Sequence, residues 1–256
     1  MRLAGANVVV TGAAGGIGAA LARRFAAEGA ARVVVADVTA GVDTVAAAIG
    51  GVALRCDVAS AADVERLVDT VERDVGPIDL FCSNAGVAIL GGPEAPDDAW
   101  KLSIDVNVMA HVYAARALVP RMLERGGGYL LQTASAAGLL TQLGSAPYSV
   151  TKHAAVAFAE WLAITYGDRG LKVSVLAPQA VRTAMTAGTP GGGVAGVDGM
   201  LEPDAVADAV VAGLAAEQFL ILPHPQVLEY FRRKADDYDR WLAGMRRLQR
   251  RFDMPI

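Results

Sequence analysis

Residues 11–18 read TGAAGGIG, and this stretch decides the fold because it stands between NVVV (7–10) and the helical run AALARRFAAEG (19–29). Glycines placed after a strand and before a helix permit a tight turn whose backbone N–H groups can approach a pyrophosphate. An isolated match would equally fit an ordinary glycine-rich turn, but the flanking strand and helix favour a dinucleotide site. We therefore expect Gly12, Gly16, Ile17 and Gly18 to contact the cofactor.

Short β-branched runs alternate with longer alanine-rich segments along the chain. The runs are NVVVT (7–11), RVVVAD (32–37), GVALRCD (51–57), IDLFCS (78–83), GYLLQTAS (128–135), KVSVLAP (172–178) and QFLILP (218–223). Strands that are apolar on both faces and joined by helical segments predict a parallel sheet with right-handed crossovers. The expected fold class is α/β, a Rossmann-like doubly wound sheet of about seven strands with helices on both faces. Ligands of such sheets bind beyond the carboxyl ends of the strands, where Asp37, Asp57, Asn84 and Ser135 fall.

Asp37 ends the second expected strand, where a carboxylate can accept hydrogen bonds from both hydroxyls of the adenosine ribose. The same carboxylate would repel a 2′-phosphate, and Val38 beside it offers no compensating cation. NAD is therefore expected in preference to NADP. The alternative is that Asp37 only caps a turn.

Tyr148 and Lys152 lie one helical turn apart in PYSVTK (147–152), so their side chains are expected on one face of a helix spanning about Pro147 to Tyr166. A nearby ammonium favours the phenolate and lowers the pKa of a tyrosine, which would make Tyr148 a usable base. The Tyr-x-x-x-Lys pattern alone is weak evidence, because a solvated helix surface often contains one.

Taken together, TGAAGGIG, Asp57 with Val58, the SNAG run (83–86), Asn107, Ser135 and the pair Tyr148 and Lys152 resemble the short-chain dehydrogenase/reductase family. The resemblance extends from about residue 3 to 223. It implies that Asp57 and Val58 lie near the adenine, and that Asn84, Ala85 and Gly86 support the cofactor. It also implies that Asn107 lies on a long helix below the active site, and that Pro178 and Thr183 contact the nicotinamide. The chain departs from the family at Gln179, where a glycine is usual.

This resemblance implies hydride transfer between NAD and a secondary alcohol or ketone, with Asn107, Ser135, Tyr148 and Lys152 as catalytic residues. In this scheme Tyr148 exchanges the proton, Ser135 holds the substrate oxygen, Lys152 binds the nicotinamide ribose, and Asn107 holds a water that relays the proton. A catalytically silent dinucleotide sensor is the alternative, in which the C-terminal helix recruits a partner. A lyase or epimerase on the same fold is a third possibility.

Apolar side chains dominate the loops that are expected to form the substrate pocket. The candidate pocket residues are Leu90, Leu139, Leu140, Leu143, Gln179 and Met185. Because these loops contain no arginine cluster that would bind a carboxylate or phosphate, a lipophilic substrate is expected. The same leucines could equally pack the loops onto the core. Glycine-rich residues 186–199 are expected to form a lid that substrate orders.

The composition limits the range of possible partners. With 256 residues, a net charge of −4 and 54% hydrophobic residues, the chain has neither a nucleic-acid footprint nor a disordered composition. We expect a cytoplasmic protein without stable membrane insertion, with reduced Cys56 and Cys82 and with no metal site. Residues 1–225 are expected to form one catalytic domain. Residues 226–256 are expected to form an amphipathic helix that packs on its own subunit or a neighbour in a homodimer or homotetramer, with a membrane-surface helix as the alternative.

Overall fold

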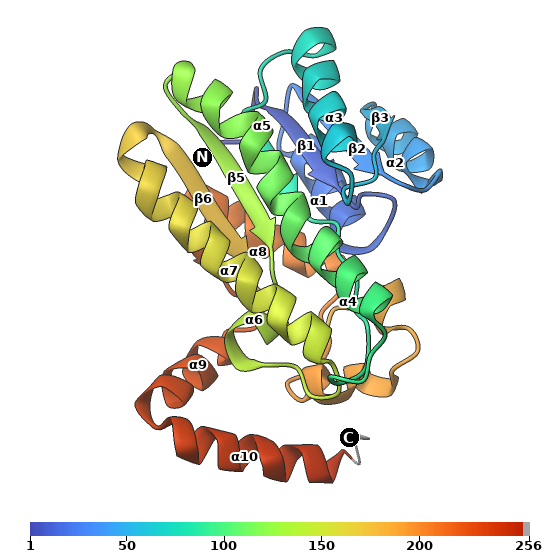
Figure 1. Cartoon of the computed structure of the whole chain (residues 1–256). Coiled ribbons are helices and arrows are strands. Elements are labelled where there is room, and N and C mark those ends of the chain that lie inside the picture. The colour runs from blue at the N-terminus through green and yellow to red at the C-terminus, as the bar shows by residue number, and fades with distance from the viewer. Residues whose placement is uncertain (253–256) are drawn as a thin grey trace.

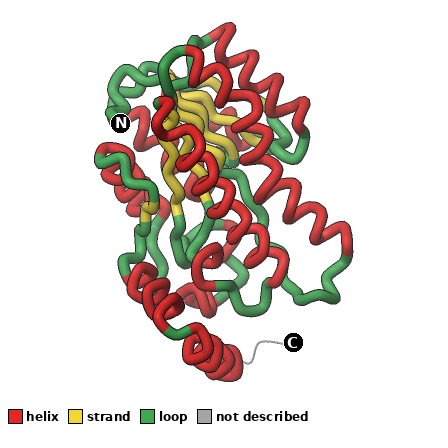
Figure 2. The backbone as a smooth tube through the Cα atoms, turned by 60° about the vertical axis from the view of Figure 1, so that its left-hand side comes forward, coloured by secondary structure: helices red, strands yellow, loops and turns green. Residues whose placement is uncertain are grey.

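The computed structural model describes residues 1–252, which form a seven-stranded sheet with helices on both faces (Figures 1 and 2). The strand order is β3-β2-β1-β4-β5-β6-β7, and each neighbouring pair is parallel. The strands are β1 (Asn7–Thr11), β2 (Arg32–Asp37), β3 (Val52–Arg55), β4 (Leu80–Ser83), β5 (Gly128–Thr133), β6 (Leu171–Leu176) and β7 (Leu220–Ile221). The doubly wound α/β fold predicted from the alternating pattern is therefore confirmed.

Two hydrophobic cores lie on the two faces of the sheet. Helices α1 (Gly16–Ala27), α2 (Gly41–Ile49) and α8 (Pro203–Ala215) cover one face, and α3 (Ala61–Asp74), α5 (Ala110–Glu124) and α7 (Ala146–Tyr166) cover the other. Strand β1 shows the alternation, because Val8 and Val10 pack into the first core and Val9 into the second. All three side chains are fully buried, which explains why the strands read as continuous apolar runs.

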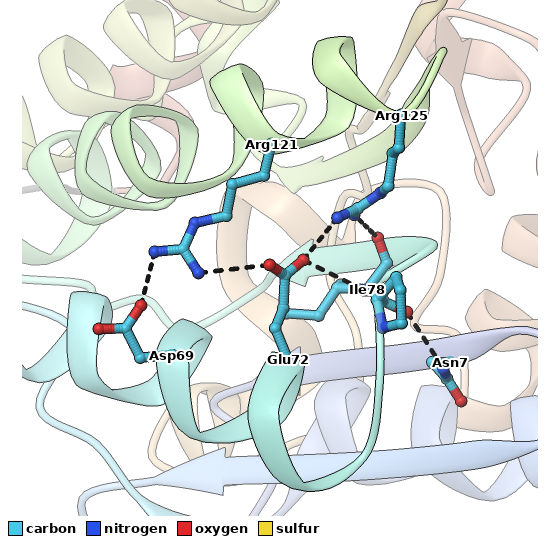
Figure 3. Close-up of polar contacts among 7 residues, drawn as sticks. Asn7, Asp69, Glu72, Ile78, Arg121 and Arg125 are labelled. Carbon is cyan, nitrogen blue, oxygen red and sulfur yellow. Dashed lines mark hydrogen bonds and ion pairs between the residues drawn. The ribbon is translucent and has the colours of Figure 1, made fainter.

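An ion-pair network joins α3 to α5 (Figure 3). Arg121 contacts both Asp69 and Glu72, while Arg125 contacts Glu72 at 2.6 Å and also donates to the carbonyl of Ile78. Burial raises the pKa of Glu72, but hydrogen bonds from Arg125, the Ile78 N–H and Arg121 outweigh this and hold the pKa below its usual value. This network lies away from the carboxyl ends of the strands, where it ties the outer helices together.

A π-helical turn interrupts the helical segment in which Asn107 lies. The segment consists of α4 (Asp97–Ile104), η1 (Asp105–Met109) and α5. The family resemblance implies a long helix here, and the sequence does not reveal the π turn because such a turn has no distinct pattern of apolar residues. Such turns often occur at functional sites, since the extra residue displaces a side chain from the regular helical spacing.

The C-terminal amphipathic segment is two helices and not the single continuous helix that the sequence predicts. Helix α9 (Gln226–Asp236) ends at Asp237, whose extended backbone breaks the helix and whose side chain accepts a hydrogen bond from the Arg240 N–H to begin α10 (Tyr238–Arg251). Helix α9 is anchored by the buried Val227 and by Lys234, which donates to the carbonyl of Leu139 at 2.6 Å. Residues 253–256 of the predicted extension lie outside the described residues.

Three of the four remaining short elements lie at the carboxyl ends of the strands, and the turn at Gly167–Arg169 lies at the amino end of β6. The four elements are α6 (Ala137–Leu140) and the 3-10 turns η2 (Gly167–Arg169), η3 (Ala184–Thr186) and η4 (Pro190–Gly196). Within the described chain, no helix combines the length and the apolar character needed to cross a bilayer. Cys56 and Cys82 are both buried free thiols.

Candidate active site

A single cavity of about 2380 Å³ runs along the carboxyl ends of the strands. It lies where the winding of the sheet reverses between β1 and β4, which is where ligands of doubly wound sheets bind. The predicted site residues that line it are Gly12, Gly16, Ile17, Gly18, Asp37, Asp57, Val58, Asn84, Ala85, Gly86, Leu90, Ser135, Leu140, Leu143, Tyr148, Lys152, Pro178, Gln179, Thr183 and Met185.

Two residues expected at the site lie behind its wall. Leu139 is 5% exposed and belongs to the core formed with α5 and α7, so it packs the loop down and does not line the cavity. Asn107 is fully buried and contacts the residues that support the wall. The sequence of an apolar loop cannot distinguish a leucine that lines a pocket from a leucine that packs in the core, because both positions favour apolar side chains.

The glycine-rich loop is shaped by close backbone approaches. Gly12 has a φ of +65°, and a Cβ added there would lie 2.6 Å from the Cα of Ala85. A Cβ on Gly18 would lie 2.2 Å from the carbonyl oxygen of Gly12. Only glycine fits at these two positions, which bring the start of α1 against the loop after β4.

The start of α1 fits the pyrophosphate of a dinucleotide. Gly15 is the N-cap residue and has no side chain, so among the described residues no side-chain cap satisfies the N–H groups of the first turn. These N–H groups and the positive end of the helix dipole face the cavity and are suited to bind an anion.

Asp37 lies at the end of β2 with its carboxylate beside the glycine-rich loop. Its Oδ2 accepts from the Ala14 N–H at 3.1 Å, and its Oδ1 accepts from the Thr39 N–H and hydroxyl at 3.0 and 3.2 Å. Asp37 therefore caps a turn and also lines the cavity. Arg55 pairs with Asp37 in the strand register but contacts the Val38 carbonyl and Asp43, and it does not line the cavity.

Helix α7 presents Tyr148 and Lys152 to the cavity. Ser145 caps this helix by accepting from the Tyr148 N–H at 3.3 Å, which fixes its first turn. The ammonium of Lys152 donates to the carbonyl of Thr133 at 3.0 Å and lies 5.6 Å from the centre of the Tyr148 ring. Ser135 follows β5 and lies beside the tyrosine, with its hydroxyl donating to the Pro178 carbonyl at 3.3 Å.

Burial dominates the electrostatics of this pair. It raises the pKa of Tyr148 above its ordinary value, while the neighbouring Ser135 hydroxyl partly opposes the rise. Burial also lowers the pKa of Lys152 to about 8. From the sequence, Lys152 is expected to lower the pKa of Tyr148. In the protein without bound cofactor, loss of solvation outweighs this effect, because the phenolate and the ammonium are both buried.

Asn107 ties the loop after β4 to α7. Its side-chain amide donates to the Val87 carbonyl at 2.9 Å and to the Thr151 hydroxyl at 3.1 Å, and its Oδ1 accepts from the Val87 N–H at 2.9 Å. A Cβ added to Gly86 would lie 3.2 Å from this Oδ1 and 3.3 Å from the nitrogen of Lys152. The absence of a side chain at Gly86 therefore lets the amide oxygen and the ammonium converge.

Gln179 stands where the family that the sequence resembles usually has glycine, and this residue lines the cavity. Its backbone N–H donates to Nδ1 of His224 at 3.2 Å, which fixes the chain after β6. Its Oε1 is buried without a hydrogen-bond partner among the described residues. The glutamine side chain therefore places a buried polar acceptor in the segment after β6.

The C-terminal helix α10 lines the outer part of the same cavity, which sequence reasoning did not predict. Its contributing residues are Arg240, Trp241, Gly244, Met245, Arg247, Leu248, Gln249 and Arg251. The periodicity of this segment shows its amphipathic character, but the place where it packs depends on the break at Asp237. The expectation of a pocket without arginines applies only to the loops and not to this helix.

Comparison with known proteins identifies the family. A model of short chain dehydrogenase matches residues 6–190. The chain belongs to the short-chain dehydrogenase/reductase family. Members of this family use a nicotinamide cofactor, and the chain is one of its oxidoreductases.

Named relatives and a solved structure support this membership across most of the chain. The chain is 38% identical to 1-deoxy-11-beta-hydroxypentalenate dehydrogenase of Streptomyces exfoliatus, over 93% of this chain and 90% of the relative. It is 33% identical to 2,5-dichloro-2,5-cyclohexadiene-1,4-diol dehydrogenase LinX of Sphingobium indicum, over 74% and 78%. The structure of a short-chain dehydrogenase/reductase from Burkholderia phymatum in complex with NAD superposes with a TM-score of 0.85 at 30% identity, over 93% of this chain and 96% of that chain.

Proposed function

We propose that this enzyme transfers a hydride between NAD and a lipophilic secondary alcohol or ketone, with Tyr148 as the general acid and base. The observation that carries the proposal is that one cavity joins the glycine-rich loop and Asp37 to Ser135, Tyr148 and Lys152. Bound NAD supplies the hydride acceptor at its nicotinamide ring. The start of α1 holds the pyrophosphate, and Asp37 holds the adenosine ribose.

The protein's own groups position the substrate and move the proton. The Ser135 hydroxyl holds the substrate oxygen, and the Tyr148 phenol takes the proton during alcohol oxidation and returns it during ketone reduction. Because burial raises the pKa of Tyr148, formation of the phenolate requires positive charge nearby. Lys152, whose pKa of about 8 leaves it mostly protonated at neutral pH, supplies part of this charge.

The proton then leaves through the space beside Gly86. The convergence of the Asn107 Oδ1 and the Lys152 nitrogen supports the placement of a relay water there, with both atoms as hydrogen-bond partners. The three protein contacts of the Asn107 amide keep its oxygen aimed at this space.

An apolar, ring-shaped alcohol is the proposed substrate class. The relatives from Streptomyces exfoliatus and Sphingobium indicum are named for a pentalenate and a cyclohexadiene diol, and the first name denotes the anion of an acid. The leucines Leu90, Leu140 and Leu143 line the cavity here and supply apolar surface for such a body.

We also propose a homodimer or homotetramer that is assembled through the outer face of α7. Val150, Trp161 and Ile164 are 53%, 53% and 84% exposed and follow one stripe of this helix. Ala154 and Ala157 lie between them on the same stripe, and their small side chains leave room for a second helix to approach closely.

The decisive test is Tyr148→Phe, which removes the hydroxyl and keeps the ring. We expect kcat to fall at least about a hundredfold, in the range usual for loss of a general acid and base, while the Kd for NAD changes little. The measurements are NADH formation with a panel of cyclic secondary alcohols and calorimetric titration of NAD. Survival of the activity in this variant would show that another group moves the proton.

A variant elsewhere in the chain separates this loss from general damage. Tyr113→Phe removes a phenol from α5 that does not line the cavity, and its turnover should equal that of the unmodified enzyme. If NAD binds but no alcohol or ketone reacts in the unmodified protein, the silent sensor becomes the better description.

A further inference from the structure

Helix α10 covers the mouth of the cavity at the end opposite the glycine-rich loop. Figure 1 shows it running beneath α6 and the loops at the carboxyl ends of the strands. The family model ends at residue 190, so this part of the wall lies beyond the segment that defines the family. The chemistry of α10 is therefore suited to determine which substrate this particular enzyme accepts.

Three arginines of α10 line the cavity from one face of the helix. Arg240, Arg247 and Arg251 are separated by two turns and one turn, while Arg250 on the same helix does not line the cavity. No acidic side chain of the described residues forms an ion pair with any of these three lining arginines. Within the described part of the chain, these guanidinium groups therefore place positive charge at the cavity wall.

Gly244 leaves a notch between the first two arginines of this row. A Cβ added there would lie 3.7 Å from Nη2 of Arg247, so the guanidinium lies directly over the glycine. Trp241 and Leu248 line the cavity beside this row. The face therefore combines cationic forks with apolar surface, which suits an apolar molecule that carries a negative group at its edge.

Other charged groups on the cavity wall include Arg233, Glu94, Asp236 and Asp237. Arg233 is paired with Glu229, and Glu94 accepts from the Gly92 N–H at 2.7 Å. Asp237 accepts from the Arg240 N–H at 2.9 Å as the helix cap, and Asp236 ends α9. Asp236 and Asp237 therefore lie beside Arg240 at the start of α10, whereas Arg247 and Arg251 lie farther along the helix.

We propose that Arg240 and Arg247 form an anion-binding subsite and that the substrate is an alicyclic alcohol or ketone bearing a carboxylate. This inference rests on the proposed function for the reacting end of the molecule. The carboxylate accepts hydrogen bonds from the guanidinium forks, whose planar geometry matches two carboxylate oxygens. The apolar body spans the leucine-lined part of the cavity, and the carbinol carbon reaches Tyr148 and Ser135.

Binding can be measured without any turnover. The probes are 1-adamantaneacetate and its neutral amide, titrated by calorimetry into the NAD-loaded protein. We expect the carboxylate to bind more tightly than the amide, and Arg240→Ala with Arg247→Ala to weaken it at least tenfold, which corresponds to about 1.4 kcal/mol. The matched variant Arg250→Ala removes an arginine from the same helix and should leave the Kd of the carboxylate unchanged.

Turnover measurements provide a second test of the subsite. The probes are 4-hydroxycyclohexanecarboxylate and its methyl ester, and the quantity is the ratio of their kcat/KM values. We expect this ratio to favour the acid in the unmodified enzyme and to fall at least tenfold in the double arginine variant, mainly through KM. Equal binding of acid and amide, or an equal loss in the Arg250→Ala variant, would overturn the subsite. Absence of turnover with normal carboxylate binding would instead count against the proposed function alone.

Discussion

The carboxylate of Asp37 is the group on which the choice between NAD and NADP depends. We expect Asp37→Asn with Val38→Arg to raise the kcat/KM ratio of NADP over NAD at least tenfold, because the change removes the repulsion of a 2′-phosphate and adds a cation. Asparagine keeps an acceptor for the Ala14 N–H that the aspartate now holds at 3.1 Å. Steady-state kinetics with both cofactors check this, with Val38→Arg alone as the control. An unchanged ratio in the double variant would refute the assignment.

His111 is a fully buried imidazole on α5, and neither ring nitrogen has a hydrogen-bond partner among the described residues. Burial lowers its pKa to about 3, and the nearby positive charge of Lys152 acts in the same direction. The unfolded chain takes up this proton below about pH 6.5, whereas the folded protein takes it up only near pH 3. The free energy of unfolding therefore falls by about 1.4 kcal/mol per pH unit as the pH drops through this window.

Replacement of this imidazole should make the fold less sensitive to acid. We expect His111→Leu to reduce the loss of stability between pH 6.5 and 4.5 by about 1.4 kcal/mol per pH unit, because leucine takes up no proton. Urea denaturation of both proteins at several pH values measures this, with the values at pH 7.5 as the reference. Parallel pH profiles would show that His111 is not the group responsible.

At the scale of elements, local patterns predict most of what is observed, and packing decides the rest. The run PYSVTK and the following residues predict α7, because proline at its start and glycine at its end fit a helix. The π turn at Asn107 leaves no comparable signal, and the break at Asp237 leaves only a weak one, because aspartate is a common N-cap residue but stands here among several acidic residues. Both depend on contacts with distant segments, such as the hydrogen bond from Asn107 to Thr151 and the anchoring of Lys234 on Leu139.

Some features of the candidate site can likewise be predicted from local sequence, and others depend on packing. Residues that act through backbone geometry or reactive groups, such as Gly12 and Tyr148, can be predicted from the sequence because few other residues can take their place. The pKa of Tyr148 cannot be predicted from the sequence, since burial and nearby charge depend on the folded structure. The position of α10 on the cavity wall cannot be predicted from the sequence either. The arginine spacing identifies one face of the helix but not the surface that this face covers.

Helix α10 itself can be removed with little damage to the core, because none of its described residues is fully buried and only Trp241 among them packs against a core cluster. We expect deletion of residues 238–256 to leave the Kd of NAD nearly unchanged, since the glycine-rich loop lies at the other end of the cavity. The KM for alcohol substrates should rise at least about tenfold, because the cavity loses one wall. Kinetics and calorimetric NAD titration measure the two quantities, and the full chain is the control. An unchanged KM would exclude α10 from the substrate site.

At the scale of the whole molecule, the outer face of α7 leaves a continuous apolar stripe in contact with water. Ile164 is 84% exposed and Trp161 is 53% exposed, and both lie one or two turns from the small Ala157. Large exposed apolar side chains in a row are uncommon on a monomer, and they are usual at interfaces between subunits. In a symmetric dimer the same stripe from two copies would pack together, so that one patch buries both surfaces.

Charge placed on this stripe should separate the subunits. We expect Ile164→Lys with Trp161→Lys to shift the protein to a smaller assembly, because each contact across a twofold axis then brings lysines from both copies together. Light scattering coupled to size-exclusion chromatography measures the mass at several concentrations. Leu228→Lys, which alters an exposed apolar residue on α9, is the matched control and should keep the mass of the unmodified protein. A monomeric unmodified protein, or a double variant of unchanged mass, would place any interface elsewhere on the surface.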